Sequence, residues 1–181
     1  MRSSNAVATP GLRFVAVPPW WRTFAIFAIA LFFQATVLHD VQVRGVTVSF
    51  AFLVVLWYAV SAGGLRAAFF GLVAGACEDG FSGASGAAWT IATPLAAALA
   101  GELVSATGWD HPAFLGLVAF VASFVRTVAF WIVLRAFGAS GNTAPTPDLR
   151  MALLSAAAMG AVALVVMAFF SRLRPLRVGP R

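Results

Sequence analysis

Long apolar runs, separated by short stretches rich in polar residues, glycine or proline, dominate this sequence. A helix rises about 1.5 Å per residue and needs about twenty residues to cross a membrane, so each run can be compared with that length. Six runs come near it. We predict a membrane-spanning helix in each, at residues 23–38, 46–62, 65–80, 87–104, 112–134 and 151–170. The predicted fold is all-α, a polytopic membrane protein with about six transmembrane helices in one compact bundle.

The predicted domain organisation follows from these runs. Residues 1–22 form a cytoplasmic, interfacial segment, residues 23–172 the transmembrane domain, and residues 173–181 a basic cytoplasmic tail. A cleavable signal peptide is the alternative for the first run, because that run is short. The rest of the chain is also hydrophobic, so the alternative leaves the class of protein unchanged.

The third run is interrupted by charge. Its continuously apolar part, residues 67–77, amounts to about 17 Å of helix, and Glu78 and Asp79 follow directly. Either the helix continues through this acidic pair or it stops inside the membrane. Irregular backbone at that depth is tolerated only where it is buried in protein or lines a cavity. We therefore expect residues 78–86 to pack among the other helices.

Composition supports the membrane assignment. Hydrophobic residues make up 61% of the chain and charged residues 10%, and the mean hydropathy is +0.93. A soluble domain with this composition could not cover its surface with polar groups. The single cysteine, Cys77, excludes an intramolecular disulfide and a thiol metal site, and we expect it to be a packing residue. We predict no metal and no cofactor.

The arginines indicate the orientation. All twelve basic residues are arginines, the net charge is +6, and the arginines flank apolar runs, which argues against nucleic-acid binding. With both termini cytoplasmic, eight arginines lie inside and three outside, as the positive-inside rule requires. The eight are Arg2, Arg13, Arg22, Arg66, Arg172, Arg174, Arg177 and Arg181. Trp57 and Trp109 are expected in the inner aromatic belt, and Trp89 and Trp131 in the outer one.

Arg126 is the candidate for buried chemistry. It lies in the middle of the fifth run, too far from either boundary to reach water easily, so it needs a partner inside the bundle. Depth favours Glu78 or Asp79. A structural salt bridge and a proton or ion relay both remain open. An intramembrane enzyme would have to be built on these three residues alone, and we predict that the protein is not an enzyme.

Small residues predict where helices approach closely. Ala67, Gly71 and Gly75 recur every four residues and form one stripe, which either packs inside the protein or receives a partner; we favour internal packing. Gly160 lies among alanines and predicts another close contact. Pro94 should kink the fourth helix.

Three further polar side chains have predicted roles. Gln34 could hydrogen-bond to a neighbouring helix. Thr90 and Thr93 are available for the backbone groups that Pro94 frees.

These motifs resemble the MreD family of bacterial rod shape-determining proteins. The resemblance covers roughly residues 24–104 and rests on glycines and small residues. The matching positions are residues 33–38 (FQATVL), Gly64, Gly71, Gly75, Asp79, Ser82, Gly83 and Gly86. The family often has a proline followed by Asp or Asn at the start of the second span, where this chain has GVTV at residues 45–48.

The resemblance implies a non-enzymatic scaffold of the bacterial inner membrane. Such proteins bind the bitopic protein MreC and, through it, MreB, RodA and a penicillin-binding transpeptidase, to guide peptidoglycan synthesis during cell elongation. Membrane lipid is the other implied partner. The family is similar in fold to the S components of energy-coupling-factor transporters, which supplies the alternative function. S components dock through alanines four apart in the first helix, and the alanines of residues 23–38 contain no such pair, so we favour the scaffold.

Overall fold

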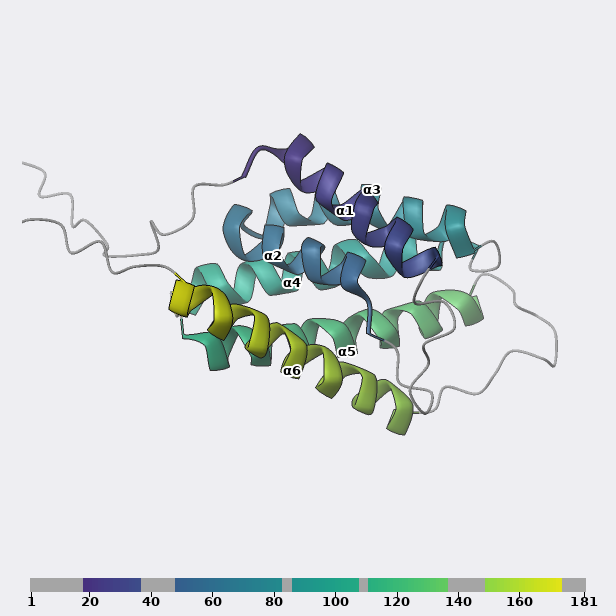
Figure 1. Cartoon of the computed structure of the whole chain (residues 1–181). Coiled ribbons are helices and arrows are strands. Elements are labelled where there is room, and N and C mark those ends of the chain that lie inside the picture. The colour runs from purple at the N-terminus through teal and green to yellow at the C-terminus, as the bar shows by residue number, and fades with distance from the viewer. Residues whose placement is uncertain (1–17, 37–47, 83–85, 108–110, 137–148, 174–181) are drawn as a thin grey trace, which may run out of the picture.

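The computed structural model describes residues 18–36, 48–82, 86–107, 111–136 and 149–173, and the side chains of these residues as far as 169. These residues form six helices and no strand (Figure 1). The helices are α1 (Trp20–Thr36), α2 (Phe50–Ala62), α3 (Gly64–Ser82), α4 (Ala88–Thr107), α5 (Pro112–Ala136) and α6 (Leu149–Leu173). The all-α prediction is confirmed.

The start of α1 differs from the prediction. The helix begins at Trp20, so the boundary predicted at residue 22 falls within its first turn. The carbonyl oxygen of Pro19 accepts hydrogen bonds from the amides of Arg22 and Thr23, at 3.0 and 3.3 Å. Because proline has a fixed φ and no N–H of its own, it is well suited to the entry of a helix.

The start of α2 lies four residues later than predicted, at Phe50. Ser49 caps it, because its hydroxyl oxygen accepts a hydrogen bond from the Phe52 amide at 3.1 Å. The helix ends at Ala62, as predicted, and Gly63 follows with a φ of +83°. This positive φ, which favours glycine, allows α3 to start directly behind α2.

The third helix continues through the acidic pair. α3 runs without a break to Ser82, which settles the choice between a continuous and an interrupted helix. It packs on α4 with almost no space between the two backbones. A Cβ atom on Gly75 would lie 2.3 Å from the carbonyl oxygen of Trp89, and one on Gly71 would lie 2.9 Å from the Cα of Pro94. The small-residue stripe therefore lies inside the bundle.

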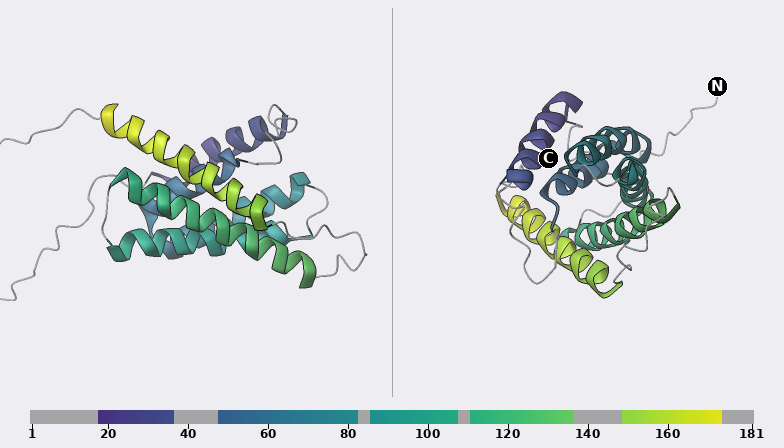
Figure 2. Two further views of the ribbon diagram at one scale, coloured as in Figure 1. Left: turned by 90° about the horizontal axis from the view of Figure 1, so that it is seen from below. Right: turned by 90° about the vertical axis from the view of Figure 1, so that its right-hand side faces the viewer.

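A second close contact joins α5 and α6, which cross in Figure 2. A Cβ atom on Gly160 would lie 2.9 Å from the carbonyl oxygen of Gly116, and one on Gly116 would lie 3.2 Å from that of Gly160. The sequence indicated Gly160 but not its counterpart. The core between the other helices combines fully buried aromatic side chains with small ones, for example Phe27 and Phe52 with Ala96 and Ala100.

Three helices have the length and hydropathy to cross a membrane. These are α4, α5 and, within α6, Leu149–Phe169. Of the other three, α1 has 17 residues and α2 has 13, or about 26 and 20 Å, and α3 carries the acidic pair. The assignment of six spans stays a prediction, and so does the orientation, because many of the arginines counted on the two sides lie outside the described residues. These are Arg2, Arg13, Arg44, Arg174, Arg177 and Arg181.

Candidate functional site

Arg126 and Glu78 form a buried ion pair between α5 and α3. Each side chain is only 8% exposed, and an Nη2 hydrogen of Arg126 is donated to Glu78 Oε2. Thr93 of α4 completes the network. Its hydroxyl oxygen accepts a hydrogen bond from Arg126 Nε at 3.1 Å, and the hydroxyl donates to Glu78 Oε2 at 3.2 Å. Three helices thus contribute one polar side chain each to one closed set of hydrogen bonds.

Two aromatic rings lie against the Arg126 guanidinium. The Phe52 ring of α2 lies with its centroid 4.3 Å from the guanidinium carbon, and the Trp89 ring of α4 lies at 4.2 Å. Such cation–π contacts contribute about 2 kcal/mol each when they are desolvated. Trp89 also stacks on Phe130, with 4.1 Å between ring centroids. The indole is therefore half-buried at the start of α4, and its place in the outer aromatic belt stays a prediction.

We call Phe52, Glu78, Trp89, Thr93 and Arg126 the Arg126 cluster. It joins four successive helices, α2 to α5. Its geometry favours a structural ion pair over a proton relay, because Glu78 and Thr93 occupy donors of the guanidinium while the rings cover it. Within the described residues there is also no group of three or more His, Cys, Asp or Glu side chains that could hold a metal ion.

Asp79 has a different role from its neighbour. Its Oδ1 accepts a hydrogen bond from the Trp89 amide at 3.1 Å, and its Oδ2 accepts from the Thr90 amide at 2.7 Å and the Thr90 hydroxyl at 2.6 Å. These two amides belong to the first turn of α4, whose amides have no partner within the helix. A carboxylate is favourable there because the helix dipole is positive at this end. Of the two candidate partners of Arg126, Glu78 forms the ion pair and Asp79 caps α4.

Gln34 stabilises another helix start in the same way. Its Oε1 accepts a hydrogen bond from the Ala51 amide, in the first turn of α2, at 3.2 Å. The described hydroxyl bonds of Thr90 and Thr93, in contrast, go to the carboxylates of α3 rather than to backbone groups freed by Pro94. α4 continues through Pro94 as one helix, with the Gly71 backbone close against it.

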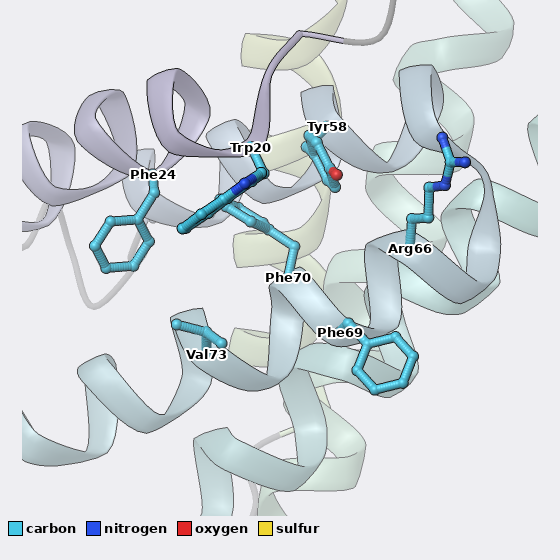
Figure 3. Close-up of a pocket in the computed structure, with 7 residues that line it drawn as sticks. All are labelled: Trp20, Phe24, Tyr58, Arg66, Phe69, Phe70 and Val73. Carbon is cyan, nitrogen blue, oxygen red and sulfur yellow. The ribbon is translucent and has the colours of Figure 1, made fainter.

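A pocket of about 420 Å³ opens between α1, α2 and α3 (Figure 3). Trp20 and Phe24 of α1 form one wall, and Tyr58 of α2 lines the floor. From α3 come Arg66, Phe69, Phe70 and Val73. This pocket was not predicted from the sequence, although an arginine and a tryptophan at the ends of two apolar runs are a signal for a membrane-interface site.

Comparison of the chain with models of protein families, with characterised proteins and with solved structures gives no match.

Proposed function

We propose that this protein is a non-enzymatic scaffold of a bacterial inner membrane, and that it holds an MreC-like partner with one membrane-spanning helix. The observation that carries the proposal is the use of the interior polar groups. Glu78, Thr93 and Arg126 bind one another, and Asp79 caps α4. Interior chemistry of this kind serves to hold the helices together, which leaves the outer surface for partners.

All six helices lie in the membrane in this proposal, although three of them are short or carry charge. α2 has 13 residues, but its side chains are largely buried by its neighbours, so its length need not match the lipid. Glu78 and Asp79 lower the hydropathy of α3, yet both are hydrogen-bonded within the protein. Polar groups that are hydrogen-bonded within the protein are tolerated inside the membrane.

The outer face of α1 is the proposed docking surface for the partner helix. Ile26, Ile29 and Phe33 are 45, 70 and 50% exposed, and their spacing of three and four residues places them on one stripe. The opposite face of α1 buries Thr23, Phe27 and Leu31. A second helix can pack along such a stripe without disturbing the bundle.

The cellular role follows from the family resemblance. Through the MreC-like partner, the protein would be linked to MreB, RodA and a penicillin-binding transpeptidase, and it would act in lateral peptidoglycan synthesis. Both termini are cytoplasmic in this proposal, which places the tail on the side where MreB-like filaments lie.

Purification in mild detergent from the cells that make the protein tests the proposal. We expect a single-span partner to co-purify, and Ile29→Trp to reduce its recovery because the larger ring blocks the α1 stripe. Val165→Trp on α6, at a position 64% exposed, is the matched control and should leave recovery unchanged. Recovery of ATPase subunits in place of the single-span partner would show a transporter S component instead.

A further inference from the structure

We propose that the pocket between α1, α2 and α3 binds an anionic phospholipid, with one acyl chain along its aromatic wall and the phosphate on Arg66. The proposal requires that these helices lie in a membrane, but it does not depend on the scaffold role.

The pocket is polar at one end and apolar at the other. Val73 lies seven residues beyond Arg66 on α3, which is about 10 Å further along the helix axis. Figure 3 shows Arg66 at one end, with the Tyr58 hydroxyl turned toward it, and Phe24 at the other end. This gradient matches a phospholipid, whose charged headgroup and hydrocarbon chain are separated by a similar distance.

The floor of the pocket is rigid and its entrance is open. Tyr58 and Phe70 are each 7% exposed and lie with their ring centroids 4.7 Å apart. Phe27 meets Phe70 edge to face at 6.1 Å, which holds α1 on α3 beside the pocket. Trp20 and Phe69, in contrast, are both 66% exposed. A chain can therefore enter from the surrounding lipid and lie against aromatic rings that are already in place.

The charge at the polar end selects the headgroup. Arg66 is exposed and has no ion pair among the described residues, so its guanidinium is available to a phosphate. Arginine offers several N–H donors in a planar arrangement that fits phosphate oxygens. An arginine near the membrane surface attracts anionic lipid. We expect it to bind an anionic lipid about fivefold more tightly than a lipid with a neutral headgroup.

Native mass spectrometry of the delipidated full chain tests the site. The protein would be titrated with phosphatidylglycerol and, separately, with phosphatidylcholine of the same acyl composition. We expect one phosphatidylglycerol to bind about fivefold more tightly than phosphatidylcholine, and Arg66→Gln to remove that preference. Arg22→Gln is the matched control, because Arg22 is also exposed at the start of a helix but contacts Trp21 outside the pocket.

Filling the pocket with a larger side chain tests whether the acyl chain lies there. Val73→Trp should weaken binding of both lipids, whereas Leu72→Trp, on the neighbouring and similarly exposed position, should not. Val73→Phe replaces Val73→Trp if that variant is not monodisperse. Glycerol phosphate, which has the headgroup charge without the chain, should not displace the lipid.

Several results would overturn the proposal. Equal binding of the two lipids by the unchanged protein would remove the phosphate contact, and equal losses in Arg66→Gln and Arg22→Gln would show non-specific charge attraction. A loss of preference in Arg135→Gln alone would assign the lipid to the smaller pocket of about 180 Å³ between α5 and α6. Displacement by glycerol phosphate, or equal effects of Val73→Trp and Leu72→Trp, would show that the acyl chain lies elsewhere.

Discussion

Arg126 shows how a charge can be stable in the middle of this bundle. A buried ion pair by itself contributes little net stability, because removing both charges from water costs about as much as their attraction returns. The arrangement around Arg126 adds a hydroxyl and two aromatic rings. Since each of these comes from a particular helix, the cluster specifies which faces of α2 to α5 meet. Its main effect is on the uniqueness of the fold.

A double-mutant cycle between Arg126 and Glu78 measures the coupling free energy of this ion pair. We expect Arg126→Met to lower the free energy of unfolding in detergent by about 3–5 kcal/mol, because it leaves the Glu78 carboxylate buried without its counter-ion. The double change with Glu78→Gln should recover part of that loss. The control cycle of Arg126→Met with Asp79→Asn should show a smaller coupling energy. A larger coupling to Asp79 would show that the ion pair is assigned to the wrong carboxylate.

At the scale of the helix, the described contacts include two helix starts that are completed by side chains from earlier helices. Gln34 of α1 binds the Ala51 amide of α2, and Asp79 of α3 binds the first turn of α4. Water can satisfy such amides in a soluble protein but is scarce inside a membrane, where each unpaired group costs several kcal/mol. These contacts therefore couple the formation of one helix to the position of another.

Amide hydrogen exchange tests this coupling for α4. We expect Asp79→Ala to accelerate exchange at Trp89 and Thr90 by about five- to thirtyfold, which corresponds to the loss of about 1–2 kcal/mol of capping energy. Ser49→Ala is the control. It removes the cap of α2 and should accelerate exchange at Phe52 while the α4 amides are unaffected. Unchanged exchange at Trp89 and Thr90 in Asp79→Ala would contradict the capping role.

The contact between α3 and α4 predicts opposite effects at two glycines of one helix. Gly75→Ala should lower the free energy of unfolding by about 1–3 kcal/mol, because the added methyl group meets the Trp89 backbone. Gly80→Ala meets nothing within 4 Å and should stabilise the helix by up to about 1 kcal/mol. Thermal unfolding of both variants gives the comparison. Equal effects would mean that α3 and α4 are not in backbone contact at Gly75.

The sequence predicted the helices better than it predicted their contacts. Helix ends follow from local signals such as Pro112 at the start of α5, and the structure places them within a few residues of the expectation. The choice between Glu78 and Asp79, and the place of Trp89 over Arg126, depend on the rotation of one helix relative to another. Adjacent residues on a helix point about 100° apart, so depth alone could not distinguish the two carboxylates.

At the scale of the whole molecule, the number of spans determines where the termini lie. Three spans place the two ends on opposite sides of the membrane, and six place them on the same side. Reporter fusions at Met1 and Arg181 distinguish these cases. We expect both fusions to report the cytoplasm, as the arginine distribution requires. An external signal from one end alone would mean an odd number of spans, as the three helices α4, α5 and α6 would give, and would exclude the six-span bundle.

The sequence separation of the central ion pair has a consequence for synthesis of the protein. Glu78 and Arg126 are 48 residues apart, and ribosomes add about 5–20 residues per second, so the carboxylate leaves the ribosome roughly 2–10 seconds before its partner. In the proposed six-span arrangement, α3 carries throughout that interval an acid that the membrane interior disfavours. We therefore expect α3 to remain at the lipid surface, or to stay within the insertion machinery, until α5 arrives. The nascent chain would then complete its insertion from the third helix to the fifth as one late step.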